Sequence, residues 1–178
     1  MKNVIKYDFP NGDKYEGEVE NNKLNGKGKY YFSEGGEFID GFLNGQGERK
    51  FIDGSVYTGN FICNVEEGTG TIVYPDGEKY IGEFRNGKIT GKGKYYYSNG
   101  DVYEGYFKSS VPNGKGTLNF ASGERYEGDF KDGKMTGHGI FFYKNGEFVE
   151  GEFEDFKLIS ASNHSQGMDE ILKNYNKK

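Results

Sequence analysis

The side chains of this chain that most often carry chemistry are few, and their spacing does not form a site. The two histidines, His138 and His164, lie 26 residues apart, and neither has a second ligand at the spacing of a metal site. The single cysteine, Cys63, is far from both in sequence and has no partner for an internal disulfide. Acidic residues recur with each repeat, which is typical of a charged sheet face, whereas a catalytic pair would occur once. We therefore expect no catalytic residues, no metal and no cofactor.

Pairs of glycines, such as Gly91 and Gly93, resemble part of a phosphate-binding loop. Such a loop reads G-x-x-x-x-G-K-[ST] and lies between a strand and a helix. No copy in this chain has Ser or Thr after the lysine, and no helical pattern follows. We therefore interpret the glycine pairs as structural.

The glycine pairs belong to a repeat. Tyr-Glu-Gly is followed nine residues later by Gly-x-Gly, as in Tyr103–Gly105 and Gly114–Gly116, and the pattern recurs with a period of 23. We align the copies on the glycine two residues after a leading residue. The leading residues are then Tyr15, Ile39, Tyr57, Tyr80, Tyr103, Tyr126 and Val149. In this alignment the second copy is too short, because Gly41 is only four residues from Gly45.

Each copy reads as two short strands, such as Tyr80–Phe84 and Gly91–Tyr97, separated by Asn-Gly or Asp-Gly turns. Short aromatic runs bounded by such turns indicate β-hairpins. The sequence therefore predicts an all-β fold, an elongated single-layer, twisted antiparallel meander of repeated hairpins over residues 1–159. A short C-terminal helix should follow.

Strand alternation puts the aromatic residues on one face and most charged residues on the other. The predicted aromatic stripe comprises Tyr80, Phe84, Tyr95, Tyr97, Tyr103, Phe107, Phe120, Tyr126, Phe130, Phe141 and Tyr143. Two interpretations stay open, and they can both hold. The rings either stack as the core of the array, or part of the stripe remains an open groove for a partner, because a single sheet has no second layer. A helical segment is one candidate occupant.

The C-terminal residues 160–178 differ from the repeats. A polar linker from Ser160 to Gly167 precedes Met168, Ile171, Leu172 and Tyr175, which share one face of an amphipathic helix. A helix this short needs a surface to pack on. It either caps the last hairpins in cis, docks on another copy or a partner, or is a frayed tail.

Composition excludes some function classes. The net charge is −5 and the pI is about 5.2, whereas a nucleic-acid module would be basic. The acidic balance also weakens, without excluding, binding to acidic lipid. No stretch has the apolar length of a signal peptide or a membrane span. We therefore expect a soluble, cytoplasmic protein.

The repeats resemble MORN repeats (membrane occupation and recognition nexus), whose consensus is close to Y-E-G-E-F-x-N-G-K-x-x-G-x-G. Tyr15–Val19, Tyr80–Lys88 and Tyr126–Lys134 carry the resemblance, which covers most of the chain. Residues 95–128 are similar to short stand-alone MORN proteins of cilia and flagella. The resemblance implies a single-layer sheet with a groove on one side. Members of the family act as scaffolds or regulatory modules, several bind phosphoinositides, others bind a helical peptide, and some dimerise.

Three hypotheses about function follow. The first is a non-enzymatic scaffold that binds protein partners, including a second copy, in a ciliary axoneme, flagellum or cytoskeletal assembly. The second is a phosphoinositide or membrane-recruitment module that uses the lysines of second strands, namely Lys27, Lys29, Lys92 and Lys94. The third is a regulatory subunit that acts on an enzyme in trans.

Overall fold

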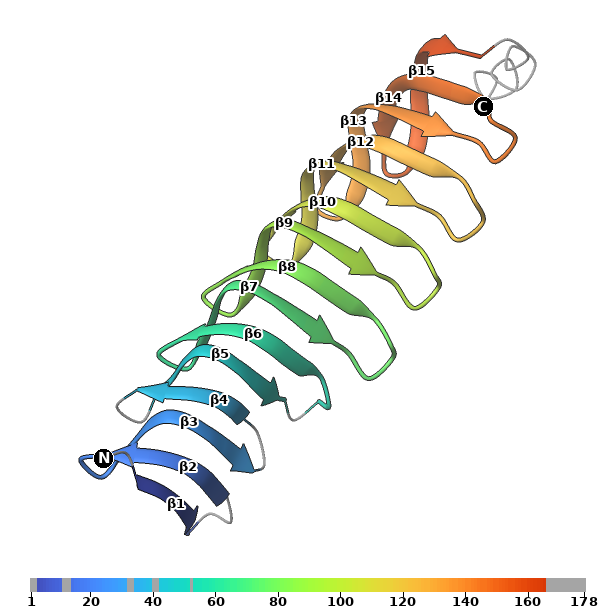
Figure 1. Cartoon of the computed structure of the whole chain (residues 1–178). Coiled ribbons are helices and arrows are strands. Elements are labelled where there is room, and N and C mark those ends of the chain that lie inside the picture. The colour runs from blue at the N-terminus through green and yellow to red at the C-terminus, as the bar shows by residue number, and fades with distance from the viewer. Residues whose placement is uncertain (1–2, 11–13, 32–33, 40–41, 52, 166–178) are drawn as a thin grey trace. The chain divides into compact units, whose positions relative to one another are not determined.

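A computed structural model describes residues 3–10, 14–31, 34–39, 42–51 and 53–165 of the 178-residue chain. The chain divides into two compact units, an N-terminal unit of residues 1–89 and a C-terminal unit of residues 90–178. In both units each strand runs antiparallel to the strand that follows it in the chain (Figure 1). None of the described residues is helical. The predicted all-β meander is therefore confirmed.

The strands of the N-terminal unit follow one another through a series of tight turns. They are β1 (Asn3–Asp8), β2 (Lys14–Glu20), β3 (Lys23–Tyr31), β4 (Glu34–Ile39), β5 (Phe42–Lys50), β6 (Val56–Ile62), β7 (Val65–Val73) and β8 (Lys79–Arg85). Each pairs with the next, from β1 with β2 to β7 with β8.

The C-terminal unit repeats the same plan. Its strands are β9 (Lys88–Tyr96), whose first two residues belong to the N-terminal unit, β10 (Val102–Lys108), β11 (Val111–Asn119), β12 (Arg125–Lys131), β13 (Lys134–Phe142), β14 (Phe148–Glu154) and β15 (Lys157–His164). Successive strands again pair antiparallel.

Turns within the repeats explain why the chain reverses so tightly. The two central residues of several hairpins both have positive φ, as in Asn86 (49°) with Gly87 (70°) and Asp132 (50°) with Gly133 (82°). This is the type I′ geometry that matches the twist of the flanking strands and favours Asn, Asp and Gly. The Asn-Gly and Asp-Gly pairs of the sequence therefore code directly for the hairpins.

A bulge follows the paired glycines of five repeats for which the register is described. Gly105 pairs with Gly116, but the next paired residues are Phe107 and Pro112, so the second strand carries extra residues at this point. Gly114 lies in the bulge with φ of 108°, a conformation that a residue with a side chain rarely adopts. A bulge bends its strand and increases the local twist. The first glycine of each Gly-x-Gly pair is therefore required by the backbone.

The strand register corrects the sequence alignment at the second repeat. Gly28 pairs with Gly36, and Gly36 pairs with Gly47, so Gly36 fills the repeat position that the alignment gave to Gly41. The leading residue is then Glu34, which precedes Tyr57 by the normal 23 residues. The alignment placed the start at Ile39 because Glu34 stands where other repeats have tyrosine. The shortening falls in the first repeat, since Glu34 follows Tyr15 by 19 residues.

The strand β15 extends the sheet beyond the last complete repeat. Its residues pair with β14, from Glu154 with Lys157 to Val149 with His164. The polar linker predicted from Ser160 is therefore strand as far as His164. The predicted helix face of Met168, Ile171, Leu172 and Tyr175 lies outside the described residues and stays a prediction.

Candidate functional site

The leading tyrosines are buried over the paired glycines. Tyr103 is fully buried, and a Cβ atom on Gly105 or Gly116 would overlap its ring and hydroxyl. The Tyr103 hydroxyl donates a hydrogen bond of 3.0 Å to the carbonyl of Tyr106. Tyr15, Tyr57 and Tyr126 lie over their own glycine pairs in the same way. We call the side of each unit that carries these rings the tyrosine face, and the opposite side the polar face.

Burial also sets the protonation of these tyrosines. It raises the pKa of Tyr57, Tyr80 and Tyr126 to about 12, and that of Tyr103 further in the same direction. The charge of Glu66 adds to the shift of Tyr57. The phenols are therefore neutral hydrogen-bond donors at physiological pH.

Phenylalanine rings connect one repeat to the next. Tyr103 makes edge-to-face contacts with Phe107 of its own repeat, at a centroid distance of 5.1 Å, and with Phe130 of the following repeat, at 4.7 Å. Tyr126 contacts Phe130 and Phe153 in the same way. In the N-terminal unit, Tyr57 contacts Phe61 and Phe84. This is the geometry that aromatic pairs prefer.

The predicted aromatic stripe therefore divides into two parts. Six of its rings are at most 5% exposed and form the core, namely Tyr80, Phe84, Tyr103, Phe107, Tyr126 and Phe130. Five are half-buried, namely Tyr95, Tyr97, Phe120, Phe141 and Tyr143. Only the second set presents ring surface that a partner could touch.

The half-buried rings lie at the ends of second strands in the C-terminal unit. Tyr95 contacts Tyr97 at 4.6 Å, and Phe141 contacts Phe120 at 5.8 Å and Tyr143 at 5.0 Å. Tyr95 pairs in register with Tyr103, so it shares the tyrosine face. Tyr97, Phe120 and Tyr143 each begin a turn between repeats and recur every 23 residues. We call these three rings the outer ladder.

Three acidic residues accompany the outer ladder, and sequence reasoning missed them. The amides of Tyr97, Phe120 and Tyr143 donate to the carbonyls of residues 101, 124 and 147, at 2.9, 2.9 and 2.7 Å. Each ring is thus the cross-strand neighbour of a carboxylate, and the three are Asp101, Glu124 and Glu147. We call them the ladder carboxylates. Their period of 23 is visible in the sequence, but the period alone does not place them beside the rings.

Neutral hydrogen-bond donors and, at Glu124, the charge of Lys144 surround the ladder carboxylates. The amide of Ala121 donates to Asp101 at 2.8 Å, and the side-chain amide of Asn145 donates to Glu147 at 2.6 Å. A hydrogen bond from the hydroxyl of Ser122 lowers the pKa of Glu124, and the charge of Lys144 lowers it further. Glu124 is therefore ionised at neutral pH, and its negative charge lies beside the ring of Phe120.

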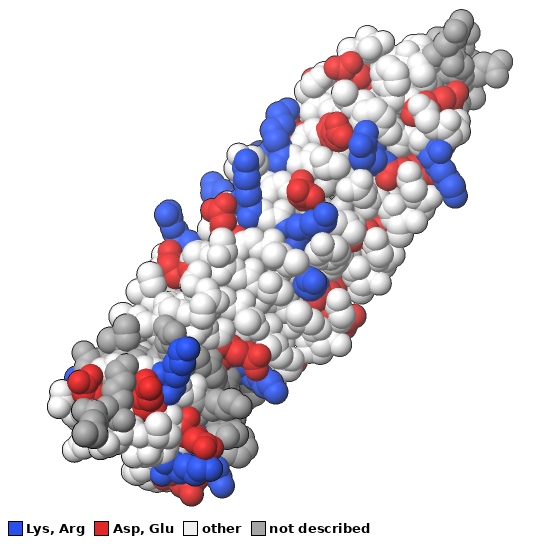
Figure 2. Space-filling model, in the orientation of Figure 1, with Lys and Arg blue, Asp and Glu red and all other residues white. Residues whose placement is uncertain are grey.

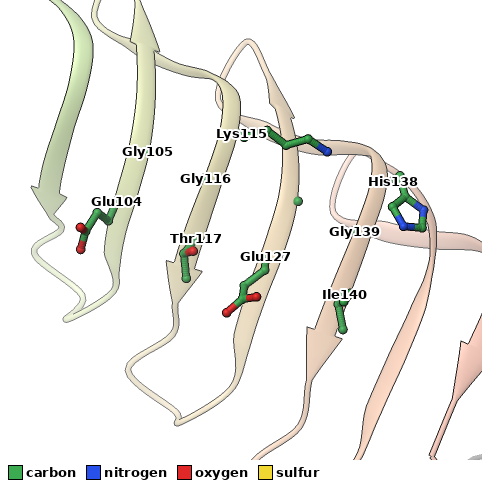
Figure 3. Close-up of a pocket in the computed structure, with 10 residues that line it drawn as sticks. Glu104, Gly105, Lys115, Gly116, Thr117, Glu127, His138, Gly139 and Ile140 are labelled. Carbon is green, nitrogen blue, oxygen red and sulfur yellow. The ribbon is translucent and has the colours of Figure 1, made fainter.

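A shallow hollow of about 440 Å³ lies on the polar face of the C-terminal unit (Figure 3). Its floor is the glycine row of Gly105, Gly116, Gly128 and Gly139. Its walls are Glu104, Thr117, Glu127 and Ile140 on one side and Lys115 and His138 on the other. The side chains of the walls are mostly charged, as the strand alternation predicted for this face.

Opposite charges on the polar face are largely paired. Lys115 contacts Asp129 at 2.9 Å, and Lys94 contacts Glu104 at 3.1 Å. A ring nitrogen of His138 also lies at hydrogen-bond distance, 3.0 Å, from Glu150. Figure 2 shows the same mixing, with basic and acidic side chains interspersed on the visible surface. Lys94, one of the lysines proposed for lipid binding, is therefore already engaged by a carboxylate. This surface suits solubility better than the attraction of a polyanion.

The N-terminal unit carries an ion pair on its tyrosine face. Arg49 Nη1 lies 2.6 Å from Glu66 Oε1, and the side chains are 15% and 9% exposed. Arg49 also donates to the carbonyl of Asn64 at 2.7 Å and lies over the ring of Phe61. Sequence reasoning missed this pair, because charged residues were assigned to the opposite face.

The candidates for chemistry are not brought together. Among the described residues, no group of three or more His, Cys, Asp or Glu side chains is placed to hold a metal ion. Cys63 is exposed in a turn of the N-terminal unit, whereas His138 and His164 belong to the C-terminal unit. Over the part of the chain that the structure describes, no helical segment has the length and apolar character that a membrane crossing needs.

The sequence profile of the MORN repeat matches residues 15–36, 36–56, 57–79, 80–102, 103–125 and 126–148. No curated protein matches the chain. Among solved structures, the TCP domain of SAS-4 (dCPAP) from Drosophila melanogaster, in complex with a proline-rich motif of Ana2, is similar at 11% identity. The match covers 84% of this chain and 90% of that chain, with a TM-score of 0.46. The TCP10 domain of Danio rerio CPAP is similar at 16% identity over 90% and 89% of the two chains, with a TM-score of 0.29.

Proposed function

Because the chain belongs to the MORN-repeat family, we propose that it is a non-enzymatic scaffold that holds protein partners on the half-buried part of its tyrosine face. One observation carries the proposal. The tyrosine and phenylalanine core is complete without Tyr95, Tyr97, Phe120, Phe141 and Tyr143, yet these rings lie on the same face and remain partly exposed. Aromatic residues are enriched where protein partners bind.

The architecture supports a binding role rather than a catalytic one. In the C-terminal unit Tyr103 and Tyr126 each contact a phenylalanine of the following repeat, so the repeats present the same surface chemistry at regular intervals. Repeat arrays use such extended surfaces to bind. The described His and Cys side chains lie apart, and the carboxylates recur with the repeat.

The location that we propose is a ciliary axoneme or another cytoskeletal assembly. The support is the similarity of residues 95–128 to short stand-alone MORN proteins of cilia and flagella. The paired lysines of the polar face argue for this placement over a membrane-recruitment role, since Lys94 is held by Glu104. A regulatory role toward an enzyme would use the same surface, with the enzyme as the bound partner.

The test is detergent fractionation of the tagged chain in its native cell, followed by mass spectrometry of its neighbours. The proposal expects the chain in the detergent-insoluble cytoskeleton with a reproducible set of proteins. Tyr143→Ala should release at least one of them, whereas Tyr106→Ala, which removes an exposed ring from the polar face, should release none. Release of the wild-type chain into the detergent-soluble fraction without stable neighbours would instead favour the membrane role.

A further inference from the structure

Rings and carboxylates alternate along one edge of the tyrosine face in the C-terminal unit. From the end of β9 to the start of β14 the order is Tyr97, Asp101, Phe120, Glu124, Tyr143 and Glu147. Each ring residue donates its amide to the carbonyl of the acidic residue across the turn. Directly opposed residues of an antiparallel pair point to the same side of the sheet. The edge therefore offers an aromatic group and a negative charge in turn.

We propose that this edge binds a basic, proline-rich segment of another protein in the polyproline II conformation, lying across the strands. The inference rests on the proposed function, because it names the kind of partner for the same surface. The chain itself has only three prolines, Pro10, Pro75 and Pro112, which are far apart in sequence. None of these 178 residues forms a proline-rich segment.

The spacing of the outer ladder favours polyproline II. Neighbouring strands lie about 4.8 Å apart, so a ring recurs roughly every 9.6 Å along the sheet. A polyproline II helix turns once in three residues and rises about 9.3 Å per turn. One side of such a segment therefore stays within about 1 Å of register over the three rings.

Other backbone conformations fit this spacing less well. An α-helix rises about 10.5 Å over seven residues, so its misfit reaches roughly 2 Å at the third ring. An extended strand presents a residue to one side about every 6.8 Å, which does not coincide with the rings. A proline-rich segment is also ordered before it binds, which lowers the entropic penalty of laying it across several repeats.

Charge complementarity selects a basic segment. The ladder carboxylates alternate with the rings, so positively charged side chains at every third residue can reach one carboxylate per turn. Arginine suits this arrangement because its guanidinium group stacks on aromatic rings and binds carboxylates. A hydrogen bond from Ser122, and to a smaller extent the charge of Lys144, lower the pKa of Glu124, the central carboxylate, so it stays ionised at neutral pH.

The test is a fluorescence anisotropy titration of the full chain with a labelled peptide of four Arg-Ala-Pro repeats. Four Arg-Ala-Ala repeats serve as a control with the same charge and a preference for helix. Phe120→Ala and Glu124→Lys should each weaken binding of the proline peptide at least tenfold. Tyr106→Ala and Glu127→Lys remove a ring and a carboxylate from the polar face, and should leave the affinity unchanged.

Several results would overturn the inference. Equal affinity for the two peptides would mean that charge alone drives the contact. Absence of binding at low salt, or binding that Glu124→Lys leaves intact, would place any such ligand elsewhere. Glu124 is a turn carboxylate whose side chain is outside the core, so this variant stays informative even if Phe120→Ala lowers stability.

The two experiments together distinguish failure of this inference from failure of the scaffold proposal. If the proline peptide fails to bind but Tyr143→Ala still releases a cellular partner, the face is an interaction site for a segment of another kind. If the variants release no partner and the peptide does not bind, the interaction site is not on this face. Binding of the peptide with the expected variant pattern supports both conclusions.

Discussion

Arg49 and Glu66 form an ion pair inside the aromatic face of the N-terminal unit, with 2.6 Å between Arg49 Nη1 and Glu66 Oε1. Arg49 pairs in register with the leading tyrosine Tyr57. At the equivalent position of a later repeat, Leu118 pairs with Tyr126. Glu66 pairs in register with Phe61. At the equivalent positions of later repeats, Pro112 pairs with Phe107 and Met135 pairs with Phe130. Two opposite charges thus replace two apolar side chains, one in each of two successive repeats. We therefore expect the two side chains to act as one energetic unit.

We predict strong coupling between these two charges. Arg49→Leu or Glu66→Leu alone should lower the free energy of unfolding by about 3–5 kcal/mol, because each leaves a charge without its partner in a largely buried place. The double variant should be close to the wild type, since apolar residues occupy the equivalent positions elsewhere. Chemical denaturation followed by circular dichroism measures all three. Additive losses in the double variant would show that the pair is not an energetic unit.

The paired glycines should tolerate no side chain. Gly116→Ala places a methyl group into the ring of Tyr103, and overpacking of this kind typically lowers stability by about 1–3 kcal/mol, or more where backbone blocks relief. Gly77→Ala is the matched control, since it has positive φ but no atom within 4 Å of the new Cβ. Thermal melts of the two variants compare packing with backbone strain. A larger loss for Gly77→Ala would contradict the packing explanation.

The buried phenols predict a loss of stability at high pH. Burial raises the pKa of Tyr57, Tyr80 and Tyr126 from 10.0 to about 12, so the folded state holds these protons more tightly than the unfolded state. Their contribution is complete below pH 10 and is lost as the pH rises through about 12. Urea denaturation at increasing pH should show this decline. Tyr57→Phe should make it less steep, and an unchanged slope would count against burial as the cause.

Removal of a core ring should lower the free energy of unfolding more than removal of a ring of the outer ladder. Phe130→Ala removes a ring that is 4% exposed and should lower the free energy of unfolding by about 3–5 kcal/mol. Phe120→Ala removes a half-buried ring and should lower it by roughly 1–2 kcal/mol. Chemical denaturation followed by circular dichroism measures both losses of stability. If Phe120→Ala were as damaging as Phe130→Ala, the outer ladder would be part of the core.

Period and turn chemistry explain why the architecture could be predicted. Asn86-Gly87 and Asp132-Gly133 both adopt the type I′ geometry that their residue types favour, and the period of 23 fixes the spacing between hairpins. The second repeat was misaligned because Glu34 replaces the leading tyrosine, so nothing local marked its start. The strand β15 was missed because Ser160–His164 contains no aromatic residue.

Alternation could place residues on faces but could not rank their exposure. Tyr97 and Tyr103 belong to the same predicted stripe, yet one is half-buried and the other is fully buried. The difference depends on the glycine pair beneath Tyr103 and on the phenylalanine that the next repeat supplies. These are contacts between separate hairpins, which no single stretch of sequence reports. The ion pair of Arg49 with Glu66 also joins separate hairpins, so the sequence pattern did not predict it.

Tyr57, Tyr103 and Tyr126 each contact the phenylalanine of their own repeat and the phenylalanine of the repeat that follows. A 23-residue segment therefore carries everything needed to join copies of itself at both ends. Duplication of such a segment within a gene would lengthen the array without disturbing the contacts on either side. Evolution could in this way adjust the number of repeats, and with it the length of the surface that we propose as a binding site.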